Sequence, residues 1–271
     1  MPRKSRASSS GETAPSSATK VSSDAMAQIS GTSSTMSEKA IRKMVSFMAL
    51  PSNFECVFPK PTDRANQPPP GCLTVYASQV LSGFRLPFPS VMGDLFSTLG
   101  IPPSQLLPNS FRLLVGFCLC SQLYHFDATV ENLLGVFTPI LSKGECFFYL
   151  SPRLGLTFIK DKPSSYGSWK TRFFFVRRAS WTILVSWALS LNPLPSVNVS
   201  EIRERMLAVG LLSHCFNAKS IVDAELLVVS GIQPSPDPYE GPEDRHTRFR
   251  KYFLYHRIFS FIFDVSDLCA S

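Results

Sequence analysis

One apolar segment constrains the fold more than any other part of the chain. Residues 109–126, "NSFRLLVGFCLCSQLYHF", are apolar on all sides of a helix after the opening Asn-Ser pair, apart from four side chains. These four are Arg112, Ser121, Gln122 and His125. A helix that is hydrophobic all round is buried all round. The sequence therefore predicts a helix that runs through the middle of a domain.

Three further helices are predicted around this central one, between residues 74 and 141. Residues 74–83 place apolar side chains on one face, with Thr74 as the N-cap. Residues 90–99 carry Met, Leu, Phe and Leu at i, i+3, i+4 and i+7, with Ser90 as the cap and a glycine stop. Residues 127–141 form an apolar stripe that begins after Asp127.

The composition of the sequence changes after these predicted helices. Three short aromatic or β-branched segments, 146–150, 156–160 and 171–178, are separated by Gly, Pro and Ser and are typical of strands in one small antiparallel sheet. Two more helices follow, one after a capping pattern at Asn198 and one over 221–231. The predicted fold class is α+β and mainly helical: a bundle of about four helices, a small antiparallel sheet and two further helices.

The amino-terminal segment has a different composition. Residues 1–37 are rich in Ser, Thr, Ala and Gly and have almost no large apolar side chains, so burial cannot offset the entropy of ordering them. We predict a disordered basic tail over residues 1–50, a folded domain over 53–238, and leave 239–271 unassigned.

Motifs of enzyme chemistry are absent from the chain. It has no G-x-S-x-G, P-loop, G-x-G-x-x-G, H-E-x-x-H or paired C-x-x-C motif. Cys118 and Cys120 point to opposite faces of the apolar helix, which favours buried, inert thiols over metal ligands. His125 is interpreted as a helix-end residue. The sequence predicts a protein that is not an enzyme, with no metal, no cofactor and no small-molecule substrate.

Charge and hydropathy limit the partners and the compartment. A net charge of +7 permits a polyanionic partner without requiring one. The amino terminus has no apolar leader, and the apolar runs at 181–191 and 252–263 are too short to span a bilayer. We expect an intracellular protein of the nucleus or cytoplasm that is not secreted and has no membrane partner.

The stretch "WKTRFFFVRR", residues 169–178, allows two interpretations. Phe173 and Phe175 point to one face of a strand, and Phe174 and Val176 point to the other, so both faces are apolar and covered. On this favoured interpretation the flanking cations only solubilise the ends of the strand. The alternative is that they contact RNA or DNA phosphates, which makes them candidate nucleic-acid-binding residues. These cations are Lys170, Arg172, Arg177 and Arg178.

Three motifs resemble a family of plant transposable-element domains described as gypsy-type transposon, or retrotransposon gag-like. They are "LGIPPSQLLPNSFRLLVGF" (99–117), "FFYLSPR" (147–153) and "PSSYGSWKTRFFFV" (163–176), within a resemblance that spans roughly residues 53–238. The resemblance carries no catalytic residue or cofactor to this chain.

The resemblance implies a non-enzymatic protein of assembly or nucleic-acid packaging, with self-association as one expected property. A second hypothesis is a domesticated or decayed derivative that acts as a nuclear DNA-associated or protein-interaction module. A third, less favoured, is an enzyme whose site forms only in three dimensions.

Overall fold

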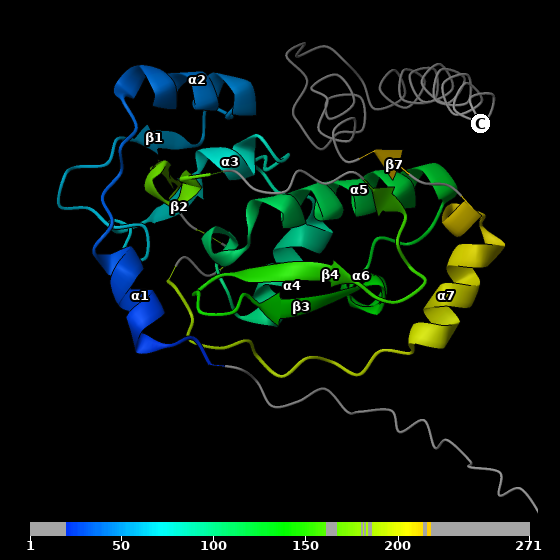
Figure 1. Cartoon of the computed structure of the whole chain (residues 1–271). Coiled ribbons are helices and arrows are strands. Elements are labelled where there is room, and N and C mark those ends of the chain that lie inside the picture. The colour runs from blue at the N-terminus through cyan, green and yellow to red at the C-terminus, as the bar shows by residue number, and fades with distance from the viewer. Residues whose placement is uncertain are drawn as a thin grey trace, which may run out of the picture.

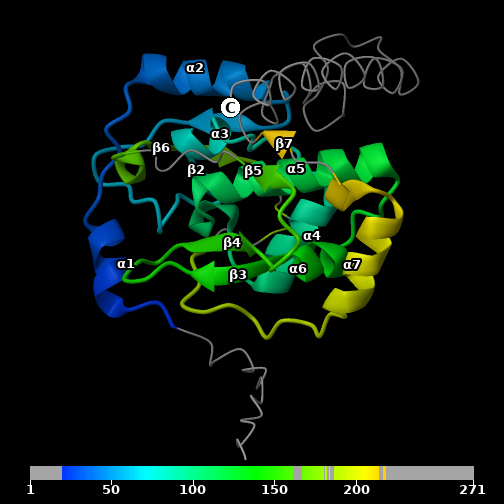
Figure 2. The same cartoon turned by 45° about the vertical axis from the view of Figure 1, so that its right-hand side comes forward.

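Helix α5 lies at the centre of the fold. The computed structural model describes residues 20–160, 167–179, 181, 183, 186–213 and 216–217. In Figures 1 and 2, α5 lies between the β3–β4 ribbon on one side and the region of α3 on the other, and it contacts both β4 and α3. The architecture is α+β, as the sequence predicts.

The described helices and strands follow one another in this order. The α-helices are α1 (Ser23–Ser30), α2 (Glu38–Met48), α3 (Ala77–Val80), α4 (Ser90–Leu99), α5 (Pro108–Tyr124), α6 (Val130–Val136) and α7 (Val199–Ala208). The 3-10 helices are η1 (Pro103–Gln105), η2 (Trp169–Thr171) and η3 (Leu211–Ser213). The strands are β1 (Glu55–Val57), β2 (Cys72–Tyr76), β3 (Phe137–Leu141), β4 (Phe148–Pro152), β5 (Ile159–Lys160), β6 (Phe173–Arg177) and β7 (Phe216–Asn217).

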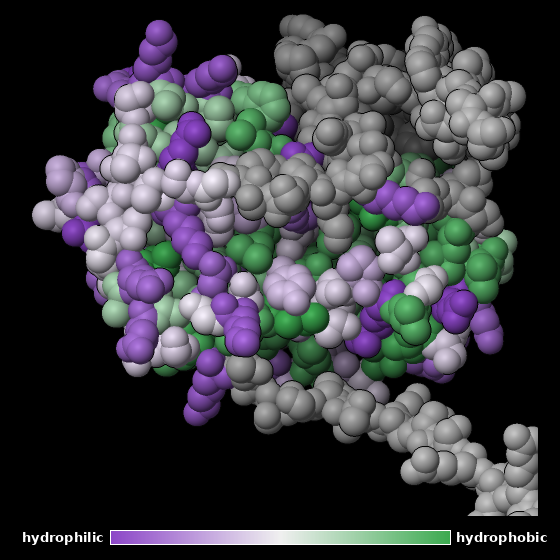
Figure 3. Space-filling model, viewed as in Figure 1, coloured by the Kyte–Doolittle hydropathy of each residue, from purple (hydrophilic) through white to green (hydrophobic). Residues whose placement is uncertain are grey.

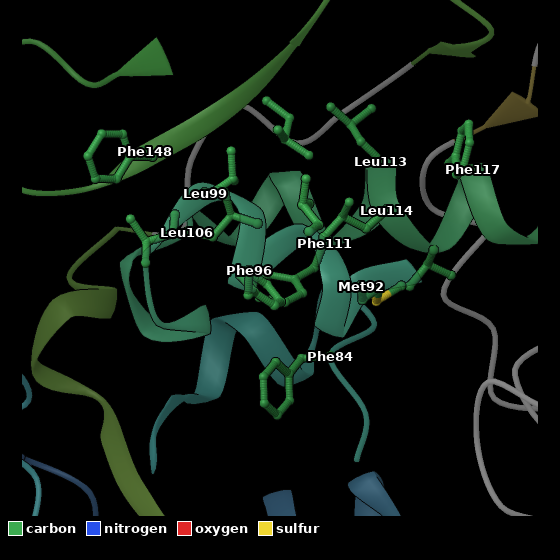
Figure 4. Close-up of a cluster of buried hydrophobic side chains, with 14 of the residues drawn as sticks. Phe84, Met92, Phe96, Leu99, Leu106, Phe111, Leu113, Leu114, Phe117 and Phe148 are labelled. Carbon is green, nitrogen blue, oxygen red and sulfur yellow. The ribbon is translucent and has the colours of Figure 1, made fainter. Parts of the chain in front are cut away.

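The hydrophobic core forms around α5, as its all-round apolar character predicts. Of its 17 residues 13 are buried, so no broad face of this helix is left to solvent. Figure 4 shows Phe96 and Leu99 of α4 gathered with Phe111 and Leu114 of α5. The Phe111 ring lies 5.3 Å from that of Phe84 and 6.2 Å from that of Phe96, measured between centroids. Such tilted and edge-on aromatic pairs add to the stabilisation from burial.

Strand β6 is the centre of a three-stranded antiparallel sheet of order β1–β6–β2. Its four residues from Phe173 to Val176 are each 0% exposed. Alternate side chains of a strand point to opposite faces, so both faces of β6 are covered. The structural interpretation of the three adjacent phenylalanines is confirmed.

The prediction of one sheet from residues 146–150, 156–160 and 171–178 is wrong in its pairing. β4 pairs with β3, β5 pairs in parallel with β7, and β6 pairs with β1 and β2. All three segments contain strands, but each finds its partner elsewhere in the chain. Strand pairing depends on long-range packing, which local composition does not encode.

Two of the predicted helices are partly strand. Within 74–83, Thr74 to Tyr76 belong to β2, and the Thr74 hydroxyl donates a hydrogen bond to the Ala65 carbonyl (2.6 Å) instead of capping a helix. Within 127–141, Thr129 is the N-cap of α6, and the helix ends where β3 begins at Phe137. β-branched and aromatic residues favour extended backbone in both segments.

The helices predicted over 90–99 and after Asn198 are confirmed as α4 and α7. Ser90 is the first residue of α4, and the N-cap is Pro89. Gly100 ends α4 at φ 67°, a left-handed conformation that glycine adopts readily. The Asn198 side chain accepts a hydrogen bond from the Glu201 amide (3.2 Å) and caps α7.

The prediction of a disordered tail over residues 1–50 is wrong for residues 20–50. Ser22 caps α1 and Ser37 caps α2, each accepting a hydrogen bond from a backbone amide. The two helices bury Ala25, Ile29, Ile41, Met44 and Met48, and Val21 just before α1 is buried as well. A few apolar side chains at helical spacing thus suffice to attach a Ser-rich segment to the core. Residues 1–19, the helix predicted over 221–231, and residues 239–271 lie outside the described part of the chain.

Candidate nucleic-acid interface

The four sequence-predicted cations do not form one cluster. Lys170 and Arg172 precede β6, whereas Arg177 ends it and Arg178 follows it. At about 3.4 Å per residue, the five steps from Arg172 to Arg177 span about 17 Å. The structure therefore places two pairs of cations at opposite ends of a buried strand.

The charge of Lys170 is compensated locally. Its ammonium forms an ion pair with the Glu145 carboxylate and lies 5.4 Å from the centroid of the Phe147 ring. That ring belongs to an aromatic group in which Trp169 lies 4.8 Å from both Phe147 and Tyr76. Lys170 thus resembles a structural cation more than a phosphate ligand. Arg172 is exposed, and its carbonyl accepts a hydrogen bond from the Ala77 amide (2.9 Å).

The other end of β6 combines cations with aromatic rings. Arg177 Nη1 donates to Glu55 Oε2 across the sheet (3.0 Å). The Cys72 thiol and the Glu55 carboxylate raise the pKa of the Arg177 guanidinium, so this group stays charged. The Arg178 guanidinium lies over the Phe54 ring at 5.1 Å.

Helix α2 adds three cations near the opposite end of β1, which the sequence did not indicate as candidates. Lys39, Arg42 and Lys43 are all exposed on α2, and the Arg42 guanidinium lies 5.2 Å from the centroid of the Phe58 ring, just beyond β1. Figures 1 and 2 place α2 beside β1, and Figure 3 shows hydrophilic side chains projecting over α2. The signal that could have revealed this helix was the spacing of Ile41, Met44 and Met48 behind a serine cap.

We name this region the α2–β1 surface. It consists of Lys39, Arg42, Lys43, Phe54, Phe58 and Arg178, together with the Glu38 carboxylate, whereas Arg177 and Glu55 lie opposite each other on the other face of the sheet. Glu38 pairs with Arg42 and Glu55 pairs with Arg177. Among the described residues, Lys39, Lys43 and Arg178 form no ion pair. The four cations and the one carboxylate of this surface leave a net charge of +3 beside two aromatic rings.

The cysteines and His125 lie outside any such site. Burial raises the pKa of Cys118 to about 12 and that of Cys120 well above its usual value, so both thiols stay protonated and unreactive at neutral pH. His125 ends α5 as its C-cap at φ 53°, as the sequence predicts. Within the described ranges, no three His, Cys, Asp or Glu side chains are grouped so that they could hold a metal ion.

None of the helices in the described part of the chain combines the length and apolar character needed to cross a membrane. No family model, no curated protein and no solved structure matches this chain.

Proposed function

We propose that this protein is a non-enzymatic, transposable-element-derived protein of the retrotransposon gag-like type, and that it packages nucleic acid through the α2–β1 surface. The observation that carries the proposal is the group of three cations that form no ion pair with another described residue, Lys39, Lys43 and Arg178, on one surface with two Arg–Phe contacts. Cations of this kind displace condensed counterions from a phosphate backbone, which supplies most of the affinity in sequence-independent binding.

The arrangement of the three resemblance motifs supports the proposed origin. The Leu107 amide of the first motif donates to the Phe148 carbonyl of the second (2.8 Å). The Ser110 hydroxyl accepts from the Leu150 amide (3.0 Å), and Trp169 of the third motif packs against Phe147 of the second. Because these segments contact one another in the core, a substitution in one of them changes the packing of the others. Such segments are expected to be inherited together as one domain.

The chemistry of the surface favours binding over catalysis. Its guanidinium and ammonium groups and its aromatic rings bind polyanions well, and its carboxylate, that of Glu38, is ion-paired with Arg42. The second hypothesis, a domesticated derivative that acts as a nuclear DNA-associated or protein-interaction module, uses the same surface. In both cases the protein acts inside the cell, in the nucleus or the cytoplasm, and self-association accompanies the packaging role.

The salt dependence of binding tests the proposal. The full chain is titrated into a labelled oligonucleotide at several salt concentrations, alongside a variant with Lys39, Arg42 and Lys43 changed to Gln. We expect the slope of log affinity against log salt to flatten by about 2 to 3 units, since each lost phosphate contact removes about 0.7 to 0.9.

The control variant removes the same amount of charge elsewhere. Lys143, Lys160 and Arg203 are exposed on the β3–β4 turn, on β5 and on α7, outside the α2–β1 surface. Changing these three to Gln lowers the net charge equally and is expected to leave the slope nearly unchanged. Equal flattening by both variants would mean that overall charge, not this surface, drives binding, and would contradict the proposal.

A further inference from the structure

We infer that the α2–β1 surface binds single-stranded rather than duplex nucleic acid, with unpaired bases stacking on the guanidinium planes of Arg42 and Arg178. This inference rests on the proposed function and names its ligand class. It comes from two Arg–Phe contacts at the two ends of β1, described below.

The first contact holds the Arg42 guanidinium between a ring and a carboxylate. Its inner side lies over the Phe58 ring, 5.2 Å from the centroid. Its edge donates from Nε to Glu38 Oε1 (2.9 Å), one helical turn earlier. The Arg42 side chain is nevertheless 68% exposed, so the plane is held on one side and along one edge but is open to solvent. Holding a guanidinium in this way lowers the entropy lost when a flat ligand stacks on it.

The second contact repeats the arrangement at the other end of the strand. The half-buried Arg178 guanidinium lies 5.1 Å from the centroid of the Phe54 ring. The Phe54 ring is backed in turn by Trp181, at 5.9 Å between centroids. The Trp181 indole is fixed by a hydrogen bond from Nε1 to the Gly71 carbonyl (2.9 Å). Arg178 is therefore supported by rings that are themselves held in place.

The two contacts belong to the same face of the sheet. Cys56 of β1 lies opposite Val176 of β6. Phe54 and Phe58 lie two residues on either side of Cys56, and Arg178 lies two residues beyond Val176, so the alternation of side chains brings them to one face. The four steps along the chain from Phe54 to Phe58 correspond to about 13 Å of extended chain. Two guanidinium groups thus lie on one face of the sheet, and the exposed Lys39 and Lys43 lie on α2 three residues before and one residue after Arg42, where they can contact phosphates.

This combination fits unpaired bases. In a duplex the faces of the bases are stacked on one another, and only their edges and the phosphates are accessible. In a single strand the base faces are free, and proteins bind them on aromatic rings and guanidinium planes in a basic groove. A duplex would contact only the charged groups of this surface, because its bases are not free to stack on the two guanidinium groups.

The test separates stacking from charge by changing Arg42 and Arg178 together to Lys, which keeps both charges and removes both planes. The full chain is titrated by fluorescence anisotropy into a labelled 20-nucleotide single strand and into the duplex of the same sequence. We expect the double variant to bind the single strand about tenfold or more weakly, at an unchanged salt slope, and the duplex as before.

Two further variants control for indirect effects. Arg205 on α7 also lies over a phenylalanine ring, that of Phe126 at 6.0 Å, away from this surface, so Arg205→Lys is expected to leave both affinities unchanged. Phe58→Leu removes the ring behind Arg42 without changing any charge, and it is expected to weaken single-strand binding several-fold. This variant keeps the test decisive if the Arg42, Arg178 double variant folds poorly.

The possible outcomes distinguish the two proposals. Salt-dependent binding that is equal for both strand forms and unaffected by the Lys changes would overturn the stacking inference and leave the packaging proposal standing. No binding to either oligonucleotide would overturn both. Binding to phosphatidylserine vesicles without binding to oligonucleotides would assign the surface to a membrane and would also overturn both.

Discussion

Helices α5 and α2 use their side chains in opposite ways. α5 is buried nearly all round and contacts only the rest of the protein. α2 buries three residues, Ile41, Met44 and Met48, and presents Lys39, Arg42 and Lys43 to solvent. The difference separates two roles: α5 supplies stability, whereas α2 is attached by a narrow stripe and is free to carry a binding surface. Substitutions on α5 should therefore mainly change the stability of the protein, whereas substitutions of the exposed cations on α2 should mainly change binding.

The largest effect is expected from Phe117→Ala on α5. The Phe117 side chain is 1% exposed and packs against Phe126 and Phe137 at 6.4 and 6.3 Å between ring centroids. Removing it leaves a cavity in the core and should lower the free energy of unfolding by about 3 to 5 kcal/mol. Urea denaturation measures this loss. Leu154→Ala is the control, because Leu154 is 100% exposed and its truncation should cost almost nothing. A loss below about 1 kcal/mol for Phe117→Ala would contradict the central place of α5.

A smaller effect is expected from Ile41→Ala on α2. Ile41 is 1% exposed, but it lies on a narrow apolar stripe near the surface, where neighbouring side chains can close part of the cavity. We expect a loss of about 2 kcal/mol in the same denaturation experiment. If the variant unfolds like the parent protein, α2 is not docked on the core, and the α2–β1 surface does not exist as a fixed arrangement.

The smallest effect on stability is expected from changing Lys39 and Lys43 to Gln. Both side chains are exposed and form no ion pair with another described residue, so the free energy of unfolding should change by less than about 0.5 kcal/mol. The same double variant should nevertheless flatten the salt dependence of nucleic-acid binding. A stability change well above that limit would indicate a structural role for these lysines and would weaken the contrast between the two helices.

The sequence predicts the elements whose signals are local. The all-round apolar pattern predicts α5, the i, i+3, i+4, i+7 spacing with a terminal glycine predicts α4, and an Asn cap predicts α7. It fails where the outcome depends on distant partners. Thr74 to Tyr76 form a strand because they pair with β6, about a hundred residues later in the chain, and no local pattern encodes that pairing.

The candidate site was predictable only in part, for a related reason. Arg178 stands out beside an aromatic run, but Lys39, Arg42 and Lys43 lie in a Ser-rich segment whose composition suggests disorder. The three buried residues of α2 gain their stabilisation only when the rest of the domain is present. The composition of a whole segment does not reveal a few apolar residues that make such contacts. They are found only when the spacing of the apolar residues is examined residue by residue.

The strand order β1–β6–β2 determines when this sheet can form during synthesis. Both outer strands leave the ribosome long before β6, the one strand between them, since β1 ends at Val57 and β6 begins at Phe173. At the usual rate of translation this delay is on the order of ten seconds. Until then β1 and β2 lack the strand with which both of them pair in the folded structure. Contacts this distant in sequence also slow folding in general, because a long loop must close before they form. The sheet can therefore be completed only after residues 173–176 have been synthesised, and Arg178 then takes its position beside Phe54.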